Sequence, residues 1–465
     1  MPKENKPNDG KVKQEIDAFV DQVARFFNEQ IVEEKARITK FVQRKSKITG
    51  QLFLTVFTFG MSMYGTPTLA QLSGLLNTIL PELDLSREAV QQRINEYAVD
   101  FFEEMLSLAI ELEVPSDIEL PVIESFERIL IFDSTSFQLP DTLAPYFRGS
   151  GGDASKSAIK ILFGYDFKSA KYFYVILNGT DPDHLINNGI IDEIGPKDLV
   201  LVDLGYFGGT AFAIIQSKGA FILSRLKSNV KIYQKNEETG DLEEFDLVEF
   251  VKNIDKSQTE VEVEVYLKAK DDEAIKLRLI IEQVPEKVKS QRLRKLNKKN
   301  NKKGRQTKKI TKILQGFNLH ITNAPSEAIP KRVVRQFYAI RWQIELIFKS
   351  WKSNFQLDKI TGRRPERIKC MIYAKLLFIF ITTKIIRLAC IYTWNNSKRE
   401  VSEFQAAKHF KIVGYDWMKS INNNPQEIKA TLLNAFYFIT KRCLKSKSNT
   451  RIYPIEALST IEAQA

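Results

Sequence analysis

Two short apolar runs that each end in an aspartate constrain the fold of this chain more than any other feature. They are Arg128-Ile-Leu-Ile-Phe-Asp133 and Asp198-Leu-Val-Leu-Val-Asp203, and turn-forming residues follow each of them. Continuous Val, Ile and Leu runs are typical of strands buried on both faces of a sheet. Sites in α/β sheets form at the carboxyl ends of strands, so both carboxylates are expected to face a cleft, although Asp is also a common turn residue.

The segments around these runs predict a mixed α/β sheet. Further strands are expected at 159–167, 171–178 and 221–225, with a helix at 210–218. Alternating Val and Glu over 259–267 indicate a half-exposed strand. We divide the chain into five regions: helical (1–115), strand-rich (116–227), a β-rich insertion (228–315), a second α/β part (316–395) and a helical end (396–465).

The segment from Tyr338 to Lys352 predicts one amphipathic helix. Tyr338, Arg341, Glu345 and Lys352 fall within an arc of about 60° on one side of the helix. An apolar back is formed by Ile340, Ile344, Ile347 and Trp351. Such a face is commonly just a solvated surface. A lone carboxylate among cations also suits a site where a hard metal ion and a polyanion meet.

The positive charge of the chain is concentrated in one run. The formal net charge is +12, and 287–312 holds thirteen Lys or Arg and no acid, which leaves −1 for the remainder. A run of this kind is a candidate for binding a nucleic-acid backbone, a solvated loop or localisation tag being the alternative. Within it, the residues predicted to contact DNA are Lys298, Lys299, Lys302, Lys303 and Arg305.

Near the N-terminus, two short helices joined by a turn allow a DNA-reading helix pair. Leu69 to Ile79 has helical spacing, Pro81 breaks it, and Ser86 is the expected N-cap of the next helix, whose apolar residues are Ala89, Val90, Ile94 and Phe101. Arg87 and Arg93 would lie on the second helix, with Gln91 and Gln92, where a helix-turn-helix protein reads bases. Helical hairpins are also common in proteins that never bind DNA.

Several other classes of site are disfavoured. The three cysteines are too widely spaced for a metal pair or a disulfide framework, which favours a reducing compartment. His184, His320 and His409 form no obvious ligand set. Gly205 to Gly209 lacks the Gly-Lys-Ser/Thr of a phosphate-binding loop, so no nucleotide cofactor is expected. We expect no N-terminal signal, and a buried helix at 370–392 in place of a membrane span.

Three blocks of the chain resemble those of the DDE transposases of bacterial insertion sequences. The closest resemblance is to the subfamily with a Tyr-Arg-Glu-Lys signature, which includes Bacillus-type elements. The third block is the most specific, because all four letters stand at the right spacing. The blocks are Asp133-Ser-Thr, Asp203-Leu-Gly-Tyr-Phe and Tyr338-x2-Arg341-x3-Glu345-x6-Lys352.

The resemblance implies a ribonuclease-H-like core, formed by 116–227 and 316–395 and interrupted by the insertion. It implies that Asp133, Asp203 and Glu345 bind two Mg²⁺ or Mn²⁺ ions and catalyse the reaction. Tyr338, Arg341 and Lys352 would contact DNA phosphates. Phe317 stands where a related aromatic residue stacks on a flipped base, although a core role is the commoner one for such a residue.

The expected function is therefore cut-and-paste transposition. The enzyme would cleave transposon ends and join them to target DNA, with region 1–115 binding the terminal inverted repeats. It would act as a homodimer on paired ends, in the bacterial cytoplasm and associated with the nucleoid. Two alternatives stay open: a DNA-binding protein that derives from a transposase but no longer catalyses, and a carboxylate-pair glycosidase.

Overall fold

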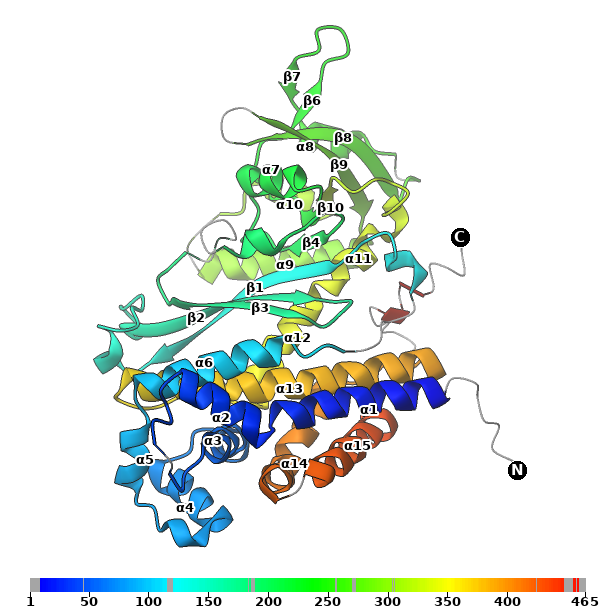
Figure 1. Ribbon diagram of the computed structural model, residues 1–465. Helices are drawn as coiled ribbons and strands as arrows, with labels where there is room; N and C mark the ends of the chain where they lie inside the picture. The colour runs from blue at the N-terminus through cyan, green and yellow to red at the C-terminus, as the bar shows by residue number, and fades with distance from the viewer. Residues whose placement is uncertain are drawn as a thin grey trace. The chain divides into compact units, whose positions relative to one another are not determined.

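The computed structural model divides into two compact units that are interleaved along the chain (Figure 1). Unit 1 comprises Met1–Glu119, Ser134–Pro182 and Ile344–Tyr453, and unit 2 comprises Leu120–Asp133, Asp183–Gln343 and Pro454–Ala465. The structure describes residues 9–44, 46–114, 120–182, 184, 189–255, 257–269, 273–302, 304, 306–423, 425–446, 455–456 and 458–459.

Unit 2 is built on a mixed sheet. Its strand order is β1-β4-β5-β10-β9-β8-β6-β7, in which β1, β4 and β5 are parallel and the later pairs are antiparallel. The predicted α/β class is therefore confirmed, and the strands of the 228–315 segment extend the same sheet. The strands are β1 (Ile129–Leu139), β4 (Leu199–Val202), β5 (Phe221–Arg225), β6 (Tyr233–Lys235), β7 (Leu242–Glu244), β8 (Glu260–Lys268), β9 (Ala274–Gln283) and β10 (Phe317–Thr322).

The helices of unit 2 fall in the same part of the sequence. They are α7 (Gly209–Ser217), α8 (Leu247–Asn253), α9 (Glu286–Lys302), α10 (Lys309–Leu314) and α11 (Val334–Ile340). We predicted no secondary structure for the basic run, yet most of it is helical, as α9 and α10.

Unit 1 is mainly helical. Its two remaining strands, β2 (Ser157–Asp166) and β3 (Tyr172–Asn178), form an antiparallel pair, and β2 neighbours the second half of β1, which belongs to this unit. Its helices are α1 (Asp9–Phe26), α2 (Glu29–Ile38), α3 (Gly50–Tyr64), α4 (Leu69–Ile79), α5 (Arg87–Arg93), α6 (Glu96–Ile110), α12 (Trp342–Ser353, from Ile344 on), α13 (Pro365–Ser397), α14 (Glu403–Asn423) and α15 (Pro425–Arg442).

Helix α13 is the centre of unit 1. It packs against α3, α6, α14 and α15 and contains the apolar segment that the sequence predicted to be a buried helix (Figure 1). By length and composition α13 could cross a membrane, but 89% of its most apolar window is buried, as in the core helix of a soluble protein. Its buried cations bond to main-chain carbonyls: Lys384 Nζ donates to Ile110 O over 2.7 Å, and Arg387 donates to Phe167 O.

Two helices predicted as continuous are interrupted. The segment 338–352 is two helices, α11 and α12, that meet at Arg341, where the Arg341 N–H bonds to Tyr338 O three residues back. The helix that begins after Ser86 ends at Arg93, and Asn95 caps a new one by accepting from the Ala98 N–H. Both breaks preserve helical spacing of apolar residues, so that spacing alone could not locate them.

Candidate active site

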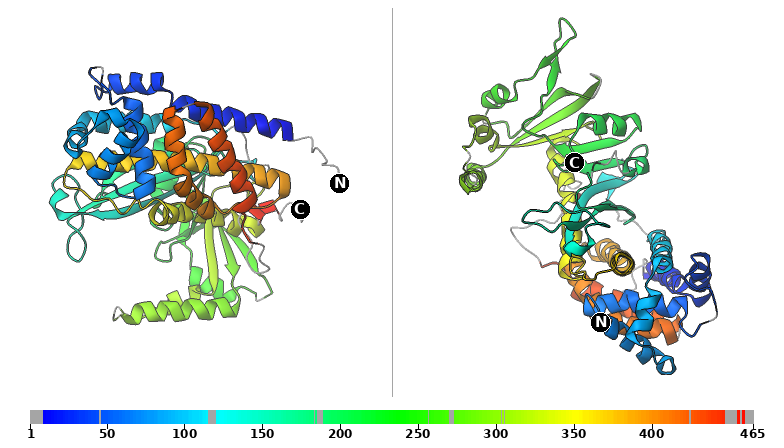
Figure 2. Two further views of the ribbon diagram at one scale, coloured as in Figure 1. Left: turned by 90° about the horizontal axis from the view of Figure 1, so that it is seen from below. Right: turned by 90° about the vertical axis from the view of Figure 1, so that its left-hand side faces the viewer.

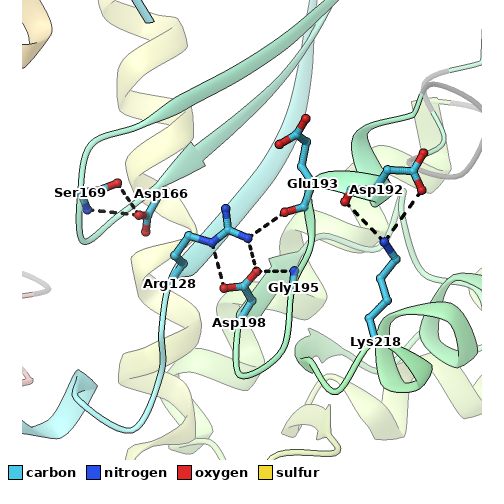
Figure 3. Close-up of polar contacts among 8 residues, drawn as sticks. All are labelled: Arg128, Asp166, Ser169, Asp192, Glu193, Gly195, Asp198 and Lys218. Carbon is cyan, nitrogen blue, oxygen red and sulfur yellow. Dashed lines mark hydrogen bonds and ion pairs between the residues drawn. The ribbon is translucent and has the colours of Figure 1, made fainter. Parts of the chain in front are cut away.

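Asp133 and Asp203 lie on the neighbouring parallel strands β1 and β4 of unit 2. Asp203 directly follows β4, as predicted, whereas the prediction that the first strand ends at Asp133 is wrong: β1 continues to Leu139, because its later residues neighbour β2. Ile131 pairs with Leu201 in the register of β1 and β4, so two residues further along Asp133 is level with Asp203. A bidentate ion pair holds the opposite ends of the strands. The Arg128 guanidinium donates to both carboxylate oxygens of Asp198, at 2.9 and 2.5 Å, and Asp198 is 1% exposed (Figure 3). This pair stabilises the register that brings the two aspartates together.

The turn after β4 orients Asp203. The Gly205 N–H donates to Asp203 Oδ1 over 2.6 Å. A Cβ at position 205 would lie 2.9 Å from the same oxygen, closer than real Cβ atoms come, so a glycine fits this turn without displacing the carboxylate. Both aspartates are partly exposed, which leaves them accessible to a ligand.

Arg341 faces the first aspartate. Its Nη1 lies 3.8 Å from Asp133 Oδ2, and the residue is only 8% exposed. The sequence predicted that Arg341 contacts a DNA phosphate, with a merely solvated helix face as the alternative. The structure does not favour the solvated alternative for Arg341, because the residue is buried beside a carboxylate. A buried guanidinium retains its charge, so the aspartate is partly neutralised from within the protein.

Tyr338 closes the other side of this cluster. Its hydroxyl lies 3.4 Å from Val202 O, next to Asp203, and its ring lies near the guanidinium carbons of Arg225 and Arg341, at 5.9 and 5.8 Å. Burial raises the pKa of the Tyr338 phenol, and the positive charges of Arg225 and Arg341 oppose that shift. The phenol therefore remains a neutral hydrogen-bonding group.

Glu345 belongs to unit 1, on α12. The predicted apolar back of this segment is buried: Ile340 and Ile344 are 0% exposed, Ile347 5% and Trp351 2%. The Trp351 ring meets Phe163 of β2 edge-on, with centroids 4.7 Å apart. Lys352 Nζ donates to Ser136 O over 3.3 Å, so α12 is fixed to β1 three residues beyond Asp133.

The three predicted metal ligands are thus divided between the two units. Among the described residues, no three His, Cys, Asp or Glu side chains are grouped as a metal site. His320 is buried beside Tyr338, and His409 stacks on Phe438. The three cysteines are buried and free.

The basic run follows β9 along the chain, and Phe317 begins β10, which lies between β5 and β9 in the sheet. Lys298, Lys299 and Lys302 are exposed on α9, whereas Lys303 and Arg305 lie outside the described residues. Phe317 is partly exposed at the start of β10, and its carbonyl accepts a hydrogen bond from Arg292 of α9 over 3.2 Å. The basic helix is therefore attached directly to the main chain of the predicted base-stacking residue.

The predicted N-terminal helix pair is present in unit 1 as α4 and α5. Ser86 caps α5 as predicted, accepting from the Ala89 N–H over 3.2 Å, and Thr68 forms a capping box on α4. A cavity of about 590 Å³ lies between these helices. Its lining includes Thr68, Arg87, Gln91, Gln92 and Arg367.

Sequence reasoning missed Arg225 as a site residue. It is exposed at the end of β5, pairs in register with His320 of β10, and is one residue beyond the Val202–Ser224 pair of β4 and β5. Asp133, Asp203, Arg225 and His320 consequently form a row across four neighbouring strands. The sequence positions of these residues on their strands could have indicated the row, but only once the order of the strands in the sheet is known.

Comparison with known proteins decides the family. Residues 124–381 match the model of the transposase DDE domain, which is more than half of the chain. The chain belongs to this family. It is 30% identical to the transposase for insertion sequence element IS231E of Bacillus thuringiensis subsp. finitimus, over 93% of each chain. It is 29% identical to the transposase for IS231F of Bacillus thuringiensis subsp. israelensis, over 94% of this chain and 93% of the relative. It is 28% identical to the transposase for IS1151 of Clostridium perfringens, over 92% of this chain and 93% of the relative.

Membership establishes the general activity. The chain is a DDE transposase of the kind that bacterial insertion sequences encode, and DNA is its partner. The resemblance seen in the three sequence blocks is therefore confirmed. Enzymes of this family use divalent metal ions. The matched region contains Asp133, Asp203 and Glu345 together with the whole Tyr338–Lys352 segment.

Proposed function

We propose that this transposase moves its element by cut-and-paste, with Asp133, Asp203 and Glu345 as the catalytic residues of a ribonuclease-H-like core. The observation that carries the proposal is the level placement of Asp133 and Asp203 on adjacent parallel strands, with Arg341 beside the first. Two carboxylates at the same level of adjacent strands are oxygen donors of the kind that Mg²⁺ and Mn²⁺ prefer. Glu345 supplies a third carboxylate from α12.

Two divalent ions at these carboxylates would supply Lewis acidity for in-line displacement at phosphorus, by water at the transposon end and then by the freed 3′ hydroxyl at the target. The chain's own residues orient the DNA. Tyr338 and Arg341 contact phosphates next to Asp133 and Asp203, and Lys352 of α12 contacts a phosphate of the same DNA. Arg341 then divides its charge between Asp133 and a phosphate, which holds the scissile strand near that carboxylate.

The remaining regions would bind and hold the ends. Region 1–115 recognises the terminal inverted repeats through α5, where Arg87, Gln91 and Gln92 line the cavity beside α4. Residues 228–315 form the insertion, and its basic run binds DNA backbone. The enzyme acts as a homodimer on paired ends in the cytoplasm, associated with the nucleoid. It needs no nucleotide cofactor, because one phosphodiester is exchanged for another.

The test is cleavage of end-containing DNA with Mg²⁺ by wild type and by Glu345→Gln. We expect the variant to bind the DNA but to lose cleavage. Glu427→Gln, at an exposed carboxylate in the first turn of α15, is the matched control and should cleave normally. Cleavage by Glu345→Gln at the wild-type rate would remove Glu345 from the triad. Metal-dependent binding without cleavage by wild type would instead indicate a transposase derivative that no longer catalyses.

A further inference from the structure

Helix α9 directs five cations to one side. At 100° per residue, Lys287, Arg294, Lys295, Lys298 and Lys302 fall within an arc of about 100°. Lys287, Arg294, Lys295, Lys298 and Lys302 are all exposed, and none of them forms an ion pair with an acidic side chain in the part of the chain that the structure describes. We call these five residues the α9 stripe. In both views of Figure 2 the helix lies at the outer edge of unit 2.

The opposite side of α9 holds the helix to the sheet. Leu293 and Leu296 are half-buried there. Arg292 also turns inward. Its Nη2 donates to Asn318 Oδ1 over 2.6 Å, and Asn318 Nδ2 donates to Glu282 Oε2 over 2.6 Å. The helix is thus bonded to β10, and through it to β9.

The second end of α9 is also fixed. Thr307 Oγ1 lies within hydrogen-bond distance of Asn300 Nδ2, at 2.8 Å, and of Asn297 Oδ1, at 3.2 Å. The Arg292 bonds to β10 and the Thr307 bonds to the last turns of α9 both oppose repulsion among the like charges. Basic residues near its C-terminus also favour the helix, because they face the negative end of its dipole.

We propose that the α9 stripe is a preformed binding surface for the phosphate backbone of duplex DNA. The stripe extends over about 22 Å, the rise of fifteen helical residues. Such a row of unpaired cations matches the closely spaced charges of a duplex and releases its counterions. Phosphates carry no base sequence, so the stripe binds end DNA and unrelated DNA alike. This inference rests on the proposed function, and it names duplex DNA of any sequence as the ligand of the stripe.

The experiment compares two triple variants that remove the same charges. The stripe variant is Arg294→Gln/Lys298→Gln/Lys302→Gln, and the control is Lys408→Gln/Lys441→Gln/Arg442→Gln on α14 and α15, where all three residues are exposed. Binding to an end-containing duplex and to a scrambled duplex is measured over a range of salt. In the stripe variant, the slope of log K against log salt should become less negative by about 2 to 3 on both duplexes. Each phosphate contact contributes about 0.9 to the steepness of this slope. The control should keep the wild-type slope.

Three results would overturn the proposal: an unchanged slope for the stripe variant, an equal fall for the control, or a fall on end DNA alone, which would indicate base reading. Circular dichroism of both variants shows whether α9 stays folded. The Glu345→Gln cleavage assay separates the two proposals. Loss of cleavage by Glu345→Gln with an unchanged stripe slope would reject only the stripe, whereas normal cleavage by Glu345→Gln would reject the proposed chemistry whatever the stripe does.

Discussion

The imidazole of His320 packs against the phenol ring of Tyr338, with 5.1 Å between the ring centroids. His320 is 4% exposed on β10, so the phenol that flanks Asp203 rests on a buried histidine. Burial, with the nearby charges of Arg225 and Arg335, lowers the pKa of His320 to about 4. Near neutral pH the imidazole of His320 is therefore uncharged, and in this form it packs against Tyr338.

This support should fail in acid. The folded-state pKa of His320 is below its ordinary value of 6.5, so the unfolded chain takes up the proton first as the pH falls. The stabilisation is complete above pH 6.5 and is lost as the pH falls to about 4, by roughly 3 kcal/mol at most. His320→Phe should lack this loss when urea unfolding is followed across the window. His184→Gln, at an exposed histidine, is the control. A wild-type pH profile in His320→Phe would contradict the prediction.

Arg341→Lys should reduce cleavage although it preserves charge. Arg341 is buried at 3.8 Å from Asp133, where a planar guanidinium can serve a carboxylate and a phosphate together and an ammonium cannot. We expect the rate of DNA cleavage to fall roughly tenfold or more, with a smaller change in DNA binding. Arg363→Lys, at an exposed position, should leave the rate unchanged. Equal rates for both variants would show that charge alone matters at Arg341.

Arg128→Leu should destabilise unit 2. The change leaves the Asp198 carboxylate, 1% exposed, without its bidentate partner, and breaking a buried pair from one side costs about 3–5 kcal/mol. Urea unfolding measures the loss. The double variant Arg128→Leu/Asp198→Leu should recover a large part of it, because no buried charge remains. Lys231→Leu, which breaks the exposed Lys231–Glu244 pair, should change unfolding little. A loss no larger than that of Lys231→Leu would contradict this account.

Lys384→Met should flatten the alkaline stability profile. Burial lowers the pKa of Lys384 to about 8, below its ordinary 10.5, so between these values the unfolded chain holds more protons than the folded one. Wild-type stability should then rise with pH across this window, by roughly 2 to 3 kcal/mol from this residue. In Lys384→Met that part of the rise should vanish, as measured by urea unfolding. Lys375 is present in both proteins, so its own titration cancels in the comparison. An identical rise in the two proteins would show that Lys384 does not titrate in this range.

Much of unit 2 could be predicted because buried parallel strands leave apolar runs that few other structures produce. The strand Phe221–Arg225 has the bounds that the sequence predicted, and Asp203 follows its strand as expected, whereas β1 continues past Asp133 to Leu139. What could not be predicted depends on partners distant in the sequence. Helical spacing continues through Arg341, and only the nearby Asp133 explains why this cation is buried. In the sequence, Lys384 is likewise only an interruption of an apolar run. Its burial is explained by its hydrogen bond to the carbonyl of Ile110, which is distant in the sequence.

The central position of α13 also bears on how the protein is made. Helices α3 and α6, which pack against it, leave the ribosome more than 250 residues before its first turn. Their apolar faces must stay covered by temporary contacts, or by a chaperone, until α13 arrives. A product that stops short of Pro365 would lack this partner and expose those faces to proteases. A chain long enough to contain α13 also contains Glu345, which precedes it in the sequence. Chains that lack Glu345 would therefore be the ones exposed to degradation.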